Sequence, residues 1–171
     1  MVEYDIKETI ESTHNFYEVA MEVIIIGGGA SGLFCAGFMT DYHKVTIIEH
    51  SDMCGKKLLI TGKGRCNITN MSDKNELIVA MTKNNKFMYS AFSQFDAYDT
   101  VAFFEDNGVP IKVERGNRVF PISDKSVDVV DCLYNFVLKN GVEIINEKAI
   151  GIESENEKVT AVQLENGEKV E

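Results

Sequence analysis

Three glycines and one glutamate are the residues of this sequence whose types and spacing best fit a defined chemistry. Gly27, Gly29 and Gly32 form a G-x-G-x-x-G pattern, and Glu49 follows Gly29 by 20 positions. In dinucleotide-binding folds the first glycine permits a tight turn, the second admits a pyrophosphate, and the third lets helix and strand pack closely. A carboxylate at this distance accepts hydrogen bonds from ribose hydroxyls. The spacing therefore predicts a site for an adenine dinucleotide.

The segments around these residues supply the elements that such a site needs. Residues 23–26 are a short, apolar, β-branched run, which predicts a central parallel strand buried on both faces. Residues 33–39 predict a helix whose N-terminus offers N–H groups and a positive dipole end to phosphates. Residues 44–48 predict a second strand that ends at Glu49. The alternatives are a glycine-rich turn in an ordinary βαβ unit and, for Glu49, a solvated strand end.

The net charge and the cysteine content argue against several classes of partner and of site. The 171 residues carry a formal net charge of -10, which argues against a nucleic-acid or anionic-membrane partner. Residues 51–70 are an exception, because four basic residues there outnumber one acidic residue, as suits a bound anion. The four cysteines lack C-x-x-C spacing, so we expect no metal site and no disulfide framework. Reduced thiols, with neither a signal peptide nor a membrane-spanning run, favour a cytoplasmic location.

Two longer motifs carry a resemblance to a known family. They read GKKLLITGKGRCNITN at residues 55–70 and RVFPISDKSVDVV at residues 118–130. With residues 27–36 and Glu49, they closely resemble the aminoacetone-oxidase-like family of bacterial FAD-binding proteins, also called YhiN-like or BaiN-like. The resemblance covers about residues 21–171. It implies an FAD cofactor and an α/β fold with a Rossmann-like parallel sheet of the glutathione-reductase type.

The resemblance also assigns residues to parts of FAD. It places the pyrophosphate at Gly27, Gly29, Ala30, Ser31 and Gly32, and the adenosine ribose at Glu49. It places Lys56 and Lys57 beside that ribose and phosphate region. The segment near the pyrophosphate or flavin includes Gly62, Gly64, Arg65, Cys66 and Asn67. In similar flavoproteins the turn after the third strand holds adenine through backbone groups, which makes Ala149 a candidate.

A long excursion, at about residues 55–122, is expected between the second and third strands. Three helices are expected within residues 72–107, followed by a hairpin over residues 109–120 that turns at Gly116 and Asn117. About 90 residues therefore separate the two strands, whereas a plain NAD domain needs one short crossover. The flavoprotein resemblance requires such an excursion.

Apolar side chains recur at helical spacing in the three expected helices. They are Leu77, Val79, Met81, Phe87, Met88, Phe92, Val101, Phe103 and Phe104. This spacing favours packing in a core over a pocket for the flavin. Arg115 and Arg118 of the hairpin are solvated charges or, less commonly, groups that steer an anionic substrate.

The remaining elements complete the expected fold. A helix capped by Ser123 or Asp124 runs to Asn140, with an apolar face of Val127, Val130, Leu133, Phe136 and Val137. A third parallel strand is expected at residues 142–145, and a β-meander pair at residues 149–153 and 159–164.

Two domain assignments follow from these expectations. Residues 1–20 are acidic and only weakly periodic, so we expect an N-terminal extension, with Met21 as a candidate natural start. Residues 21–171 are then an FAD-binding Rossmann-like domain. The resemblance implies that it is incomplete, about the first two-fifths of such a protein.

The expected function is the FAD-binding portion of a flavin-dependent oxidoreductase. It would act on an unidentified small organic substrate, with NAD(P)H or oxygen as redox partner. One alternative is an NAD-dependent dehydrogenase, which Glu49 also permits, and another is a truncated nucleotide-binding module without catalysis. Cys66 is either a redox thiol, with its pKa lowered by Arg65, or a small buried residue, and the second interpretation is favoured.

Overall fold

A parallel sheet of three strands organises the chain. The computed structural model describes residues 21–171, and the expected extension at residues 1–20 lies outside them. The strands β1 (Glu22–Ile26), β2 (Lys44–Ile48) and β5 (Glu143–Ile145) pair in the order β1-β2-β5. The helix α2 (Ala30–Met39) connects β1 to β2. The predicted βαβ unit and third parallel strand are therefore confirmed.

The position of β1 in the sheet corrects one prediction. Residues 23–26 were expected to form a central strand, but within the described chain β1 pairs only with β2 and lies at an edge. Ile26 is 53% exposed, so the strand is not buried on both faces along its length. An apolar β-branched run indicates a strand but does not report how many neighbours that strand has.

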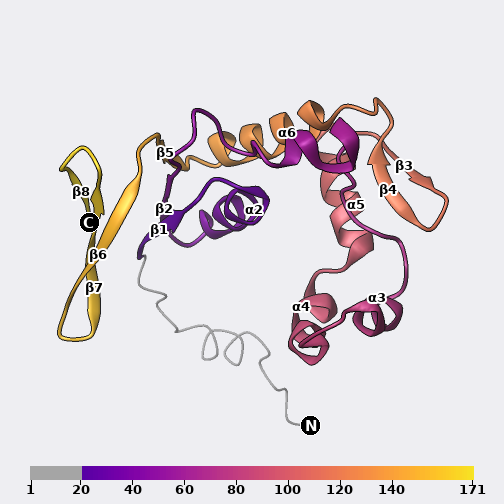
Figure 1. Ribbon diagram of the computed structural model, residues 1–171, viewed down its shortest axis with the longest axis horizontal. Helices are drawn as coiled ribbons and strands as arrows, with labels where there is room; N and C mark the ends of the chain where they lie inside the picture. The colour runs from indigo at the N-terminus through magenta and orange to yellow at the C-terminus, as the bar shows by residue number, and fades with distance from the viewer. Residues whose placement is uncertain (1–20) are drawn as a thin grey trace, which may run out of the picture.

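Both faces of the sheet are covered. The helices α2 and α6 (Ser126–Lys139) pack on one face, where Ile47 contacts the main core. On the other face, Ile48 packs against Val162 and Leu164 of the β-meander. The meander consists of β6 (Ala149–Glu155), β7 (Lys158–Leu164) and β8 (Lys169–Val170), and β8 was not predicted. Figure 1 shows the yellow meander and the two helices on opposite sides of the sheet.

The excursion after β2 contains the three predicted helices and the predicted hairpin, together with two short 3-10 helices that were not predicted. The two 3-10 helices are η1 (Leu58–Gly64) and η2 (Asn85–Phe87), and the predicted helices are α3 (Lys74–Ala80), α4 (Met88–Gln94) and α5 (Ala97–Asp106). A hairpin of β3 (Ile111–Glu114) and β4 (Arg118–Pro121) follows, and its turn contains Gly116 and Asn117, both with positive φ. In Figure 1, α3 and α4 lie beyond α5, away from the parallel sheet.

The expected apolar stripe is only partly a core. Phe103 and Phe104 of α5 are buried, as predicted. Val79 and Phe87 are 79% and 83% exposed within the described chain, so core packing is wrong for these two side chains. Helical spacing identifies the side of a helix that is apolar, but the fold decides whether a neighbour covers that side.

The start of α6 also differs from the prediction. The helix begins at Ser126 rather than after a cap at Ser123 or Asp124, because the Asp124 carboxylate binds Arg65 and Lys112 instead. Val130, Leu133 and Val137 are buried as expected, and Phe136 is half-buried. Val127 is 43% exposed, and Val129 takes its place in the core. Between residues 21 and 171, no helix has the length and apolarity required to cross a membrane.

Candidate functional site

The glycine turn between β1 and α2 has the geometry that its sequence predicts. Gly27 has φ +106°, a conformation that favours glycine, and its N–H donates to the Ile48 carbonyl at 2.8 Å. A Cβ at Gly32 would lie 2.0 Å from the Gly27 carbonyl oxygen, so only glycine allows this packing. A Cβ at Gly29, the N-cap of α2, would meet no atom within 4 Å. The turn is therefore tightly packed at Gly32 and open at Gly29.

A cavity of about 570 Å³ opens beside this turn. One wall contains the predicted pyrophosphate residues Gly27, Gly29, Ala30, Ser31 and Gly32. The other wall comes from the loop after β2 and contains Gly55, Lys57, Leu58 and Thr61. The first N–H groups of a helix have no partner within the helix, and a lysine lies across from them. The cavity therefore has the chemistry of an anion site.

Glu49 lies at the end of β2 and faces the glycine turn. Its Oε2 accepts from the Gly28 N–H at 2.7 Å, and its Oε1 accepts from the Ser51 N–H at 2.7 Å. Burial raises the pKa of Glu49, but the hydrogen bonds from Ser51 and Gly28 outweigh it, so the pKa is lowered overall. The residue is only 7% exposed, which does not fit a solvated strand end. An ionised carboxylate retains lone pairs for a further donor.

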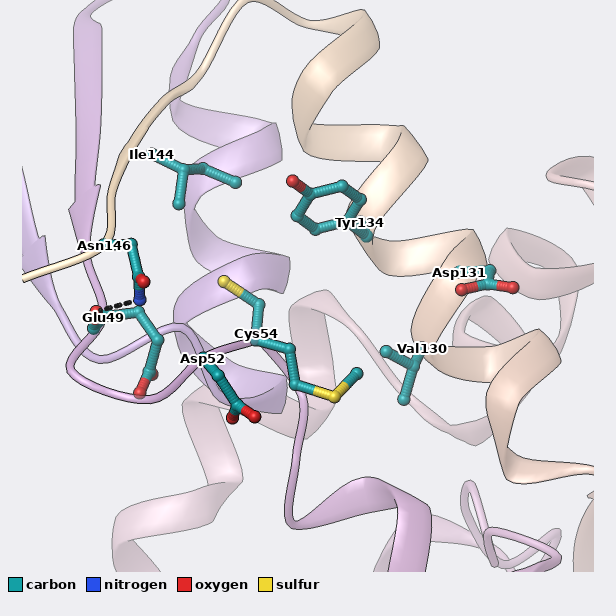
Figure 2. Close-up of a pocket in the computed structure, with 9 residues that line it drawn as sticks. Glu49, Asp52, Cys54, Val130, Asp131, Tyr134, Ile144 and Asn146 are labelled. Carbon is teal, nitrogen blue, oxygen red and sulfur yellow. Dashed lines mark hydrogen bonds between the residues drawn. The ribbon is translucent and has the colours of Figure 1, made fainter.

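A second cavity, of about 320 Å³, adjoins Glu49. Figure 2 shows Glu49 and Asn146 on one side of it and Val130 and Tyr134 of α6 on another. The Asn146 amide donates to the Glu49 carbonyl at 3.0 Å and also to the Ser51 carbonyl. Asn146 thus ties the end of β5 to the loop after β2. Sequence reasoning missed this residue, although a polar side chain directly after a parallel strand is a usable signal.

A second set of missed residues joins the loop after β2 to the glycine turn. A Cβ at Gly28 would lie 2.4 Å from the Cys54 sulfur, so a side chain at this position would have to displace the Cys54 thiol. The Gly55 N–H donates to the Gly28 carbonyl at 2.8 Å, and Gly55 has φ +70°. The G-x-G-x-x-G pattern leaves position 28 unspecified, which is why the sequence alone did not identify it.

Comparison with known proteins identifies the family of this chain. Residues 21–171 match the family described as "HI0933-like protein Rossmann domain". The chain belongs to the HI0933-like family. Members of this family are flavin-dependent oxidoreductases, so the match confirms both the resemblance and the fold class expected from the motifs.

Two curated relatives and one solved structure show how far the similarity extends. The HI0933-like chain is 33% identical to the 3-dehydro-bile acid delta(4,6)-reductase of Clostridium scindens, over 70% of this chain and 29% of the relative. It is 30% identical to the ribosomal RNA dihydrouridine synthase of Haemophilus influenzae, over 87% of this chain and 35% of the relative. The chain thus spans about a third of the length of these relatives.

Among solved structures, a flavocytochrome c3 fumarate reductase in an open conformation matches the HI0933-like fold. The TM-score is 0.55, with 16% identity, and the match covers 95% of this chain and 33% of that one. At this identity the likeness shows the fold alone.

The remaining predicted residues of the HI0933-like domain line neither cavity. Lys56 pairs with Asp52 at 2.8 Å on the surface. Gly62 and Gly64 lie in η1, and Asn67 is exposed. Ala149 packs with the cluster of Ile48, Val162 and Leu164, on the meander face of the sheet. Arg65 pairs with Glu114 and Asp124.

Cys66 has the environment of a buried structural residue. It is 2% exposed, and burial raises the pKa of its thiol. The Arg65 guanidinium contacts carboxylates of other segments, so the alternative in which Arg65 lowers the thiol pKa does not hold, and the favoured interpretation as a small buried residue agrees with the structure. In the described part of the HI0933-like chain, residues 21–171, no three His, Cys, Asp or Glu side chains form a group suited to a metal ion.

Proposed function

We propose that residues 21–171 form the FAD-binding domain of a flavin-dependent oxidoreductase, with residues 1–20 as an extension. The observation that carries the proposal is the open position at Gly29 inside a cavity that also contains the start of α2 and Lys57. FAD fits these residues, because its pyrophosphate needs close access to backbone N–H groups and a nearby cation. When bound, a flavin accepts and donates electron pairs, while the protein supplies binding and orientation.

Glu49 and its neighbouring cavity are the proposed adenosine site. The ionised carboxylate lines the 320 Å³ cavity, is bonded to the glycine turn through the Gly28 N–H, and would accept hydrogen bonds from ribose hydroxyls. The 320 Å³ cavity beyond it would receive the adenine, with Asn146 fixing its rim. The contribution of Ala149 to adenine binding stays a prediction, as do those of Lys56 and the segment from Gly62 to Asn67.

FAD is favoured over NAD as the cofactor. A carboxylate at the position of Glu49 would accept the ribose of either dinucleotide, so this residue does not discriminate between them. Membership of a flavin-dependent family supports FAD. The long excursion between β2 and β5, unlike the short crossover of a plain NAD domain, points the same way.

For the whole protein we infer a reductase of carbon–carbon double bonds conjugated to a carbonyl group. The name of one curated relative gives the substrate of such a step, and the name of the other gives the product. Reduction of the carbon–carbon double bond of the uracil ring gives dihydrouridine. A delta(4,6) 3-dehydro steroid has double bonds that are conjugated with its ketone. Each reduction of such a bond consumes two electrons and two protons. NAD(P)H is the electron donor that we propose.

The substrate is either a small enone or a uracil base in RNA. The net charge of -10 argues against RNA as a general partner. The match to an RNA-modifying relative extends over 87% of this chain, so uridine-containing RNA belongs among the substrates to test. The expectation that no nucleic acid binds therefore stays a prediction.

The direct experiment identifies the ligand that the purified chain retains. We expect visible flavin absorbance, and mass analysis of the ligand released by denaturation should give FAD. Gly29→Val is the matched variant, because its side chain would enter open space in the free protein and block the pyrophosphate. It should keep the unfolding midpoint and weaken FAD binding about 100-fold, or about 2.7 kcal/mol. Retained NAD, or FAD binding unchanged in Gly29→Val, would contradict the proposal.

The full-length protein tests the reaction. Reduced protein is mixed with a steroid enone or with uridine-containing RNA, and flavin oxidation and product are followed. Turnover of either substrate supports the inferred reaction and selects the substrate class. If neither is reduced although FAD is bound, the inferred reaction is wrong while the cofactor assignment stands.

A further inference from the structure

We propose that Arg65 is a positioning residue for the flavin site. It lies outside the 570 Å³ cavity but fastens the loop whose earlier residues Lys57, Leu58 and Thr61 form one wall of that cavity. The loop is attached through Arg65 to the β3–β4 hairpin and to the segment before α6. The expected effect of Arg65 on FAD affinity rests on the proposed function. The attachment of the loop by Arg65 does not depend on that function.

The loop has a backbone conformation that needs support from elsewhere in the fold. Gly62 and Gly64 have φ values of +56° and +83°. Lys63 and Cys66 have φ values of +60° and +58°, a region that residues with a Cβ rarely adopt. Such conformations persist where surrounding contacts hold them. A loop with four such residues in five positions would not keep this shape in isolation.

Arg65 makes three contacts with distant parts of the chain. Its Nε donates to the Asp124 carboxylate at 2.7 Å, and its terminal nitrogen donates to the Glu114 carboxylate. The guanidinium carbon lies 4.1 Å from the centre of the Phe120 ring. A planar guanidinium can bridge two carboxylates and stack on an aromatic ring at once, which a lysine cannot do. Together these contacts fix the position and the orientation of the loop at Arg65.

Burial of Cys66 in the core also holds the loop, but the loop's other hydrogen bonds to distant segments of the described chain lie at its ends. At the start, the Ser126 hydroxyl donates to the Leu59 carbonyl at 2.9 Å. At the end, the Ile68 N–H donates to the Val119 carbonyl at 2.9 Å, and the Val119 N–H donates to the Thr69 carbonyl at 3.0 Å. Arg65 lies between these two attachments, in the left-handed segment. It therefore holds the part of the loop that the backbone hydrogen bonds leave without long-range support.

The chain offers a matched control for the charge of Arg65. Lys112 contacts the same two carboxylates, at 2.6 Å from Asp124 and 3.6 Å from Glu114. It belongs to β3 and not to the loop. Lys112→Gln therefore removes the same charge from the same cluster but leaves the loop attached.

The test combines amide hydrogen exchange of the apo chain with FAD titration of wild type, Arg65→Gln and Lys112→Gln. In Arg65→Gln, amides of residues 61–66 should exchange about tenfold faster, while those of β1 and β2 should not change. FAD binding should weaken about tenfold, since a competent loop present one-tenth of the time lowers apparent affinity by that factor. Lys112→Gln should match wild type in both measurements.

Each other outcome overturns a stated part of the proposal. Unchanged exchange in Arg65→Gln would show that Arg65 does not hold the loop. Faster exchange with unchanged FAD affinity would show that the loop does not position the site. Equal loss of affinity in Lys112→Gln would assign the effect to charge alone. If wild type binds no FAD, the proposed function and the positioning role both fail, while the exchange rates still decide the attachment.

A milder variant covers the case in which Arg65→Gln does not fold. Asp124→Asn keeps the contacts of Arg65 with Glu114 and Phe120. It should increase exchange in residues 61–66 about threefold, again with β1 and β2 unchanged. Wild-type exchange in this variant would overturn the proposal.

Discussion

The glycine turn and the loop that contains η1 form two walls of the same cavity, yet different kinds of contact hold them. The turn is fixed mainly by backbone contacts: the Gly27 N–H donates to the end of β2, and Gly32 packs on the Gly27 carbonyl. The loop depends on the Arg65 side chain and its partners Glu114 and Asp124, which lie 49 and 59 positions away in the chain. Backbone contacts with the neighbouring strand thus hold one wall, and side-chain contacts with more distant segments hold the other.

This difference predicts different responses to mutation. A substitution at a packed position of the turn, such as Gly32, meets backbone atoms that cannot move, so it should change the free energy of unfolding. A substitution in the loop removes a partly exposed contact, so it should change local order more than global stability. Variants of the two walls therefore separate folding from positioning.

The largest effect is expected at Gly32. In Gly32→Ala the new Cβ would lie 2.0 Å from the Gly27 carbonyl oxygen, which forces the helix away from the turn. We expect the free energy of unfolding to fall by about 3 kcal/mol in urea denaturation. Gly29→Ala is the control, since its Cβ meets no atom within 4 Å. Equal stability of the two alanine variants would show that the turn is not packed as described.

Glu49 should give the next largest effect on stability. Glu49→Ala leaves the buried N–H of Gly28 and the partly buried N–H of Ser51 without their acceptor. Loss of such a partner should lower the free energy of unfolding by about 2 kcal/mol. FAD affinity should fall as well, because the ribose acceptor is removed. A variant that is as stable as wild type would contradict the link between the end of β2 and the turn.

The contribution of Glu49 should also depend on pH in a defined direction. The folded state lowers the pKa of Glu49, so it stabilises the ionised form. This stabilisation is complete above the ordinary glutamate pKa of about 4.3 and is lost as the pH falls through the lower folded pKa. In urea unfolding from about pH 7 to about pH 3, the stability difference between wild type and Glu49→Ala should narrow only at the acidic end. If the stability difference between wild type and Glu49→Ala instead grew on acidification, the folded state would favour the neutral form of Glu49.

The same contrast explains how much of the structure could be predicted. The bounds of β2, the tight turn at Gly27 and the close packing at Gly32 follow from apolar patterns and from the steric limits of single residues. The edge position of β1 and the exposure of Phe87 could not be predicted, because they depend on which segments lie alongside. For Asp124, a helix cap and an ion pair with Arg65 compete for one carboxylate, and only the fold decides between them.

The substitution Cys66→Ser should cause the smallest change in stability among the variants predicted to be destabilised. It also distinguishes a redox role of Cys66 from a structural one. Cys66→Ser buries a hydroxyl in place of a small apolar group, so the free energy of unfolding should fall by about 1 kcal/mol. Reduction of bound flavin should be unchanged, because burial raises the pKa of this thiol and keeps it protonated.

Cys132 of α6 is the matched control for Cys66, because it is also buried and lines neither of the two cavities. Cys132→Ser should lower stability by a similar amount and leave flavin reduction unchanged, and in wild type the exposed Cys35 should react with a thiol reagent before either buried cysteine does. Altered flavin reduction in Cys66→Ser but not in Cys132→Ser would mean that the loop supplies chemistry as well as shape. The two walls of the cavity would then differ in reactivity, not only in how the fold holds them.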